Sequence, residues 1–480
     1  MDARLPDFAA AHGIRPKAHP GSLPRCPPLR RGDGHITWPD RYPEQSVLCR
    51  AMPFVEPPDL STLRYLSGSQ HRARPIVWGQ AISLLGDYVA YVTMPLFIVH
   101  LTGRGLDLGL TAAAETLPTL LFGFTAGVYL DRFAIKPILI GSDVLRAAVF
   151  MLLAFGAATD AALPWMVFLA AFVVGSLATF FNSGLETMLP SVVGEDHLVV
   201  VNSHLALART LAFALGPALG GILISVGGGF PVAFAANAAT FLVSALFLIG
   251  VRVRHKVDPS PKRPFLEELR SGLAFLLGHR QLRWVTVGAA VANLVFAPLE
   301  ALLPLFIPTY LETTLTPPDF LEFLFADEAL VGLFIGVQAA IGSVMIFFGP
   351  RLAKRAHLGR MFTAGLVLFG AGFAVMALSK SFWGVIPAGI GVGGVGYANI
   401  AIVTMRQRLA PPEMLGRVVA ASRTISWSLI PLGAALGGAL ADAVGLLPVY
   451  AFGTAGVLAT AALVTRTPVW SGPEVAPRDG

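Results

Sequence analysis

The sequence predicts an all-α membrane protein whose twelve transmembrane helices form two bundles of six helices. Hydrophobic residues make up 55% of the 480 residues and charged residues only 13%, whereas roughly a quarter of the residues in a soluble domain are charged. Twelve apolar runs approach the roughly 20 residues that a helix needs to cross a bilayer, and the longest internal linker divides them six and six. These observations exclude a soluble enzyme, and the lack of alternating polarity in the runs excludes a β-barrel.

The limits of the twelve spans follow from the charged residues, prolines and glycines that bound each apolar run. We expect spans near residues 76–101, 108–130, 137–158, 164–189, 201–226, 230–251, 284–308, 329–349, 361–379, 383–405, 417–441 and 445–465. The fifth span is the weakest prediction, because it opens with the polar residues Asn202, Ser203 and His204.

The segment before the first span, residues 1–74, differs in composition from the membrane body. It carries 11 Lys and Arg residues, many prolines and no apolar run long enough for a signal peptide or a span. We expect a disordered cytoplasmic tail without a catalytic role. An alternative is that the chain starts at Met52 and that the upstream residues are not translated.

The two bundles correspond to residues 75–251 and 284–466, joined by a linker at 252–283 and followed by a short cytoplasmic tail at 467–480. In the linker, apolar residues recur at helical spacing beside charged ones over residues 265–276. This pattern predicts an amphipathic helix that lies on the cytoplasmic surface of the membrane.

Basic residues are distributed unequally between the two sides of the predicted spans. With the N-terminus inside, the even-numbered connections receive Arg132, Lys136, eight basic residues between Arg252 and Arg283, Arg351, Lys354, Arg355, Arg360, Arg406, Arg408 and Arg417. The odd-numbered connections receive only Arg104 and Lys380. The positive-inside rule therefore predicts that both termini are cytoplasmic, in a multi-pass protein of a bacterial inner membrane. In a membrane protein this placement matters more than the net charge of +6, so we expect no nucleic-acid partner.

The fifth and eleventh spans carry similar residues in the same order. Arg209-Thr210 precedes Gly216-Pro217 and Gly220-Gly221, and Arg423-Thr424 precedes Pro431, Gly433 and Gly437-Gly438. Together with the division into six and six spans, this similarity predicts a duplicated unit. A parallel repeat about an axis normal to the membrane is a transporter architecture, in which the substrate path lies between the two halves.

The connection between the second and third spans carries a motif made of Gly127, Asp131, Arg132 and Lys136. Glycine permits close helix approach, and a carboxylate at a helix end can pair with a base or a helix N-terminus in one conformation only. The stretch resembles the G-x-x-x-D-R-x-G-R-K signature of the major facilitator superfamily. Ala134 and Ile135 replace a glycine and a basic residue of that signature. The resemblance implies that these residues form a conformational gate; an ordinary charged loop is the alternative.

Span five carries a second motif, Gly216-Pro217 followed by Gly220-Gly221. Small residues four positions apart let helices pack closely, and Pro217 removes a backbone hydrogen bond, which allows the helix to bend. The stretch resembles the antiporter motif G-x-x-x-G-P-x-x-G-G of the same superfamily, with Ala212 at the first position. In that family the motif is typical of exporters. Glycine-mediated packing without a transport direction is the alternative.

Further stretches resemble one branch of this superfamily, the drug:proton antiporters that include macrolide and siderophore exporters. They are Leu85-Gly86-Asp87, residues 142–147, residues 265–277 and residues 411–418. The resemblance covers about residues 75–466 and implies a major facilitator fold that alternates the access of a central site to the two sides of the membrane.

Carboxylates inside the spans are the candidate proton carriers. A charged side chain at the centre of a membrane helix costs about 2.5 to 3.5 kcal/mol on insertion scales, so its presence argues for a role. Asp87 lies near the middle of span one, Glu115 in the outer third of span two and Glu300 in the outer half of span seven. Asp87 is equally well interpreted as a structural or hydrogen-bonding residue, and Glu115 and Glu300 as side chains that reach toward external water.

Other polar residues in the spans are candidates for the gate or for the cavity. Asp143 and Arg146 share one helical face and predict a structural ion pair near the cytoplasmic gate. Arg209 and Arg423 are candidates to line an anion path or to pair with carboxylates of the facing half; the alternative is that they reach toward water or pack at the gate. The remaining cavity candidates are Asn293, which lies about two turns before Glu300 on the same face, Gln338 and Asn399.

The function that these patterns predict is export of a small amphipathic or hydrophobic compound by proton antiport. The partners would be this small molecule, protons and the lipid bilayer, and the transporter would be a monomer. The sequence has no P-loop for ATP, no metal-ligand cluster and cysteines only at Cys26 and Cys49, so we expect no cofactor and no metal. Alternatives within transport are a siderophore exporter or a lysophospholipid flippase. An alternative of another class is a transport-dead scaffold or sensor with the tail as its interaction module.

Overall fold

The computed structural model describes residues 30–32, 35–37, 74–193, 197–226, 228–251, 265–311, 326–355 and 357–471. The chain divides into two units, residues 1–65 and 66–480. In the first unit, β1 (Arg30–Gly32) pairs antiparallel with β2 (His35–Thr37). The rest of the predicted tail lies outside the described residues, except for Arg74, which is the first residue of a helix. Every other described element is a helix, which confirms the all-α fold.

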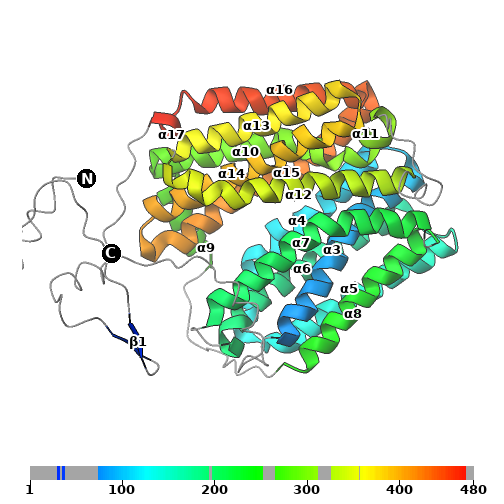
Figure 1. Cartoon of the computed structure of the whole chain (residues 1–480), viewed down its shortest axis with the longest axis horizontal. Coiled ribbons are helices and arrows are strands. Elements are labelled where there is room, and N and C mark those ends of the chain that lie inside the picture. Colours follow the sequence, from blue (N-terminus) through cyan, green and yellow to red (C-terminus); the bar gives the residue numbers. More distant parts are fainter. Residues whose placement is uncertain are drawn as a thin grey trace, which may run out of the picture. The chain divides into compact units, whose positions relative to one another are not determined.

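The N-terminal half of the membrane body contains one long helix for each of the first six expected spans (Figure 1). These helices are α3 (Arg74–Thr102), α4 (Gly105–Arg132), α5 (Ile135–Ala158), α6 (Pro164–Val193), α7 (Leu198–Val226) and α8 (Phe230–Ile249). Gly103 and Gly229 have positive φ angles of 64° and 80° at the turns between successive helices. Glycine adopts this backbone conformation without a steric penalty, so these turns remain short.

The C-terminal half repeats this arrangement and adds short helices at its edges (Figure 1). It consists of α10 (Arg280–Ala301), α11 (Leu303–Tyr310), α12 (Asp327–Arg355), α13 (Leu358–Ser379), η4 (Phe382–Gly384), α14 (Val385–Leu409), η5 (Pro412–Met414), α15 (Leu415–Val444), α16 (Leu446–Val464) and α17 (Pro468–Ser471). Along the chain, the helix α9 (Phe265–Gly278) comes between the two halves.

The helices have the length and the surface of membrane spans. Within the described ranges, eleven helices are long and apolar enough to cross a membrane. The remaining expected span is covered by the 28-residue α4. Large apolar side chains lie on the outside, for example Leu152, which is 71% exposed, and Leu378, which is 82% exposed. An apolar surface of this extent is typical of a protein that contacts lipid, so the chain is a multi-pass membrane protein.

The seventh expected span, 284–308, is not one continuous helix. α10 and α11 are separated by a break at Leu302. Pro304 follows in the first turn of α11, where the missing N–H of proline costs no helical hydrogen bond. Beside the break, the hydroxyl of Tyr450 donates to the carbonyl oxygen of Leu299 at 2.8 Å. The expected span is therefore present as two successive helices, α10 and α11.

Glycine pairs in α7 and α15 show the duplication directly. A Cβ atom on Gly220 would lie 3.0 Å from the Val89 oxygen of α3, and one on Gly221 would lie 2.3 Å from the Glu328 oxygen of α12. In α15, Gly437 faces Pro298 of α10 in the same way, and Gly438 faces the Gly105 oxygen of α4. Each pair therefore packs one helix against the first helix of its own half and against a helix of the opposite half.

The linker helix α9 packs against protein as well as presenting an amphipathic face. Leu276 is 1% exposed and clusters with Leu282 of α10 and Val418 of α15. Gly272 approaches the Arg417 carbonyl, so that a Cβ atom there would lie 2.5 Å from that oxygen. The expected helix is present, but part of its apolar face is buried against the C-terminal half, where the sequence predicted the membrane surface.

Candidate functional site

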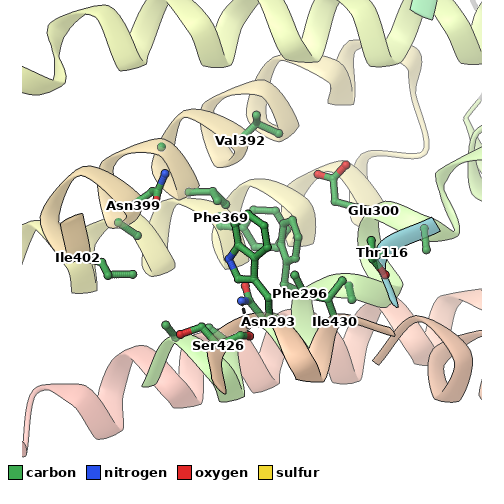
Figure 2. Close-up of a pocket in the computed structure, with 18 of the residues that line it drawn as sticks. Thr116, Asn293, Phe296, Glu300, Phe369, Val392, Asn399, Ile402, Ser426 and Ile430 are labelled. Carbon is green, nitrogen blue, oxygen red and sulfur yellow. Dashed lines mark hydrogen bonds between the residues drawn. The ribbon is translucent and has the colours of Figure 1, made fainter. Parts of the chain in front are cut away.

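A cavity of about 850 Å³ lies between the two halves of the membrane body. α3, α4 and α7 contribute to its wall from the N-terminal half, and α10 to α16 contribute from the C-terminal half. The aromatic side chains in this wall are Tyr91, Phe213, Phe296, Phe362, Phe369 and Trp427. Figure 2 shows the Phe296 and Phe369 rings between Glu300 and Asn399. An apolar wall with a few polar groups is typical of sites for amphipathic small molecules.

Two carboxylates, Glu115 and Glu300, lie in the wall of this cavity. Glu115 comes from the middle of α4, and Glu300 comes from the last turn of α10. The Gln338 amide nitrogen of α12 donates to Glu300 Oε1 at 3.1 Å. Both carboxylates act electrostatically on the hydroxyl of Tyr91. Tyr91, Glu115, Glu300 and Gln338 therefore bring polar groups from four helices and both halves into the cavity wall.

The predicted cavity residues Asn293, Gln338, Asn399 and Arg423 all line this wall. Asn293 does so from α10, and its amide nitrogen donates to the Ser426 carbonyl oxygen of α15 at 2.8 Å (Figure 2). The guanidinium carbon of Arg423 lies 5.0 Å from the centre of the Trp427 ring. This arrangement gives the wall a hydrogen-bonding side on α10 and a cationic side on α15.

Asp87 belongs to a different cluster from the cavity carboxylates. It lies outside the set of described residues that line the cavity and pairs with Arg146 Nη1 at 3.5 Å. Arg146 also pairs with Asp143, as the sequence predicted for these two residues. The guanidinium carbon lies 4.7 Å from the ring centre of Phe181 and 4.3 Å from that of Phe241. The structure thus joins α3 and α5 through one buried cation.

The predicted gate residues between α4 and α5 are only partly described. For Gly127, Asp131 and Arg132 the structure describes only the helical backbone. Lys136 donates from Nζ to the Ile249 and Val251 carbonyl oxygens, at 2.7 and 2.8 Å. A cation at the carboxyl end of a helix satisfies carbonyl groups that have no partner within the helix. Lys136 therefore caps α8 of its own half in this conformation.

The motif in α7 lies at a close contact between helices of the two halves. A Cβ atom on Gly332 of α12 would lie 2.3 Å from the Pro217 carbonyl oxygen. One on Gly216 would lie 2.5 Å from Tyr88 Cβ of α3. The helix continues through Pro217 to Val226. Arg209, on the same helix, is exposed, acts electrostatically on Asp87 and Tyr88, and is not among the described cavity-lining residues.

A carboxylate that the sequence did not single out joins the halves at the end where α4 begins. Asp442, near the end of α15, accepts hydrogen bonds from the backbone nitrogens of Gly105 at 2.7 Å and Leu106 at 2.9 Å. The N-cap residue of α4, Arg104, makes no capping bond with its own side chain. Asp442 therefore caps α4 across the interface, where the helix dipole favours a negative charge.

Other residues at the site were also missed, because sequence reasoning considered mainly charges in the middle of spans. In the sequence, Tyr91 and Phe296 look like ordinary residues of an apolar helix face. Their spacing does not distinguish them from residues that face lipid or the packed core. Arg406 was assigned to a cytoplasmic connection. The structure places it inside α14, 5% exposed and in the cavity wall. Its spacing from Asn399, about two helical turns, would have placed both on one face.

The described residues contain no group of three or more His, Cys, Asp or Glu side chains that is arranged to hold a metal ion.

Comparison with known proteins gives matches over most of the chain. The family model of the Major Facilitator Superfamily matches residues 76–434. Macrolide efflux protein A of Streptococcus pyogenes is 26% identical over 382 residues, which cover 77% of this chain and 89% of that protein. Multidrug efflux pump Tap of Mycolicibacterium fortuitum is 29% identical over 379 residues, which cover 75% and 87%. The crystal structure of a bacterial homologue of iron transporter ferroportin in inward-facing state matches with a TM-score of 0.64 at 16% identity, over 85% of this chain and all of that chain. At this identity the structural match shows the fold alone.

Proposed function

Because this chain belongs to the Major Facilitator Superfamily, we propose that it exports a small amphipathic or hydrophobic compound from a bacterial cell in exchange for protons. Two of its relatives are named as a macrolide efflux protein and a multidrug efflux pump. The observation that carries the proposal is the cavity of about 850 Å³, which aromatic side chains and the carboxylates Glu115 and Glu300 line. The aromatic side chains would contact the apolar part of the substrate, and the carboxylates would bind and release protons.

The proposed mechanism is alternating access by two rocking units, residues 75–251 and 284–466, which the linker 252–283 connects. Contacts between the halves involve Asp442 with α4 and Gly332 with α7. The cavity wall extends along α14 and α15 away from these contacts, as far as Gln407 and Leu415. With both termini in the cytoplasm of an inner-membrane protein, this geometry corresponds to an inward-facing state.

Proton coupling in this proposal uses the carboxylates of both clusters. Glu115 and Glu300 lie in the cavity wall, and the charges of Asp87 and Glu115 act on each other. Protonation from outside would weaken substrate binding, and release of the proton inside would restore it. Gly216, Pro217 and the motif from Gly127 to Lys136 would bias the two conformations.

Growth of a drug-sensitive bacterial host that expresses the full chain tests the export proposal. The panel contains macrolides, the amphipathic dye ethidium and an anionic amphiphile such as the bile salt cholate, and the readouts are the inhibitory concentration and dye accumulation. We expect the wild type to protect against at least one compound and Glu300→Gln to lose this protection. Glu186→Gln is the matched control, because Glu186 is exposed on α6 and is not among the described cavity residues. A host with unchanged resistance and accumulation across the panel would contradict the proposal.

A further inference from the structure

Arg406 is a buried cation in the cavity wall without a compensating anion among the described residues. Only 5% of this residue is exposed. Its Nε atom is buried without a hydrogen-bond partner, and no ion pair links Arg406 to another described residue. Burial of an unpaired charge is costly, because the surroundings do not replace the water that the charge loses. Arg406 is therefore placed where an anionic ligand would stabilise it.

The position of Arg406 on α14 directs it to the cavity. The cavity-lining residues of this helix recur every three or four positions, as Val395, Asn399, Val403 and Arg406 do, which places them on one helical face. Arg423 of α15 lines the same wall, and its charge acts on Arg406. Since the two charges repel each other, the pair increases the need for an anion between them.

Neither acidic residue of the cavity supplies that anion. No ion pair joins Glu115 or Glu300 to Arg406 among the described residues, and Glu300 lies far from Arg406 along α14. Gln338, which binds Glu300, contacts α14 near Gly389. From Gly389 to Arg406 the helix rises by about 25 Å at 1.5 Å per residue. Glu300 and Arg406 therefore lie at different depths of the cavity, and apolar and aromatic residues such as Phe296, Phe369 and Ile402 also line it.

We propose that Arg406, together with Arg423, forms a subsite that binds the oxyanion group, a carboxylate or a phosphate, of an amphipathic substrate. The inference rests on the proposed export function, because the same cavity would carry the substrate. A guanidinium donates two parallel hydrogen bonds to a carboxylate or phosphate. The apolar part of the ligand would pack against the aromatic wall, which offers large contact areas.

A matched pair of fluorescent probes tests the charge preference. The purified full chain in phosphatidylcholine nanodiscs is titrated with a dansyl-labelled undecanoic acid and with its methyl ester, and the saturable binding is measured. We expect the wild type to bind the acid at least about tenfold more tightly than the ester, as a charge-assisted pair predicts. Equal affinities in the wild type would overturn the proposal without any variant.

Variants of Arg406 then identify the residue. Arg406→Gln should weaken binding of the acid by about tenfold or more and leave the ester unchanged, and Arg406→Lys should retain part of the preference. Arg408→Gln is the matched control, because Arg408 lies on the same helix and is not among the described cavity residues. If Arg406→Gln weakens both probes equally, the residue has a structural or gating role and the subsite is wrong.

Competition experiments distinguish the source of the oxyanion. Lysophosphatidate and inorganic phosphate are each added against the bound acid probe. Competition by lysophosphatidate alone supports an amphiphile as the ligand, and competition by both supports a site that also accepts a free oxyanion. Competition by neither would contradict the subsite.

The outcome is separable from that of the export test. Charge-selective binding that depends on Arg406, in a protein that protects no host, would support the subsite and contradict export. Export in a protein whose Arg406→Gln variant still prefers the acid would support export and contradict the subsite.

Discussion

Arg146 shows how a single side chain holds two helices of the membrane body together. It pairs with Asp143 on its own helix and with Asp87 on α3, and it lies over two phenylalanine rings. Asp143 is fully buried. A buried carboxylate is strongly unfavourable without its counter-ion, so the ion pair makes this otherwise apolar packing possible.

Replacement of this cation should destabilise the protein more than the loss of one surface charge. We expect Arg146→Gln to lower the free energy of unfolding by about 3 to 5 kcal/mol, because it leaves the buried Asp143 carboxylate unpaired. The measurement is the thermal unfolding of the purified protein in detergent. The double variant Arg146→Gln with Asp143→Asn should recover part of the loss. A double variant less stable than Arg146→Gln would show that the pairing does not explain the effect.

Helix packing between the halves depends on glycines that face backbone atoms. Gly332 of α12 faces the Pro217 carbonyl oxygen of α7, and Gly221 faces the Glu328 oxygen in return. Backbone atoms cannot move aside as a flexible side chain can. The contact between α7 and α12 therefore tolerates no side chain at these positions.

Gly332→Ala should separate the two halves at this contact. Its Cβ atom would lie 2.3 Å from the Pro217 oxygen, so α7 and α12 must move apart. The measurement is the rate of maleimide labelling at Ala329→Cys, a position that is 1% exposed, after both native cysteines are replaced by serine. We expect faster labelling in Gly332→Ala. Gly141→Ala is the control, because a Cβ atom there would meet nothing within 4 Å; equal labelling rates in the two variants would refute the contact's role.

The cap that Asp442 places on α4 should stabilise the closed end of the cavity. Asp442→Asn removes the charge from both hydrogen bonds to the N-terminus of α4, and contacts that couple conformations are typically worth about 1 to 3 kcal/mol. We expect maleimide labelling at Leu108→Cys, which is 1% exposed in the wild type, to increase by about fivefold or more. Asp107→Asn changes a charge in the first turn of the same helix and should have little effect. Similar increases in both variants would indicate fraying of α4 instead of opening of the interface.

The sequence was sufficient to predict the elements but not their contacts. Apolar runs and the repeat of Gly220-Gly221 in Gly437-Gly438 predicted the helices and the duplicated fold, because both depend on local composition. The break at Leu302 escaped notice, since Pro304 lies inside an apolar run. Arg406 was assigned to a connection because span limits depend on the first charge encountered, although a long side chain can lie inside a helix end. The Asp442 cap joins residues more than 330 positions apart, which no local pattern reveals.

At the scale of the whole molecule, the positive-inside rule predicts the orientation in the membrane. Asp160 lies in the exposed turn between α5 and α6, and Glu413 is exposed in η5 between α14 and α15. In a cysteine-free background, an impermeant maleimide added to intact cells should label Asp160→Cys and not Glu413→Cys. Permeabilised cells should label both. Labelling of Glu413→Cys alone in intact cells would show that the orientation is opposite to the predicted one.

The central claim is that this transporter uses a proton gradient to move its substrate through the cavity between the halves. The most direct measurement is uphill accumulation, in reconstituted vesicles with an imposed pH gradient, of the panel compound that the host resists best. We expect the wild type and Glu186→Gln to concentrate the compound, and Asp87→Asn to bind it without concentrating it, because the neutral side chain imitates the protonated state. Glu115→Gln and Glu300→Gln, measured in parallel, show which span carries the proton. The proposal of proton coupling through these carboxylates is wrong if the wild type does not concentrate the compound when the pH gradient is imposed. It is also wrong if all three neutralised variants still concentrate the compound.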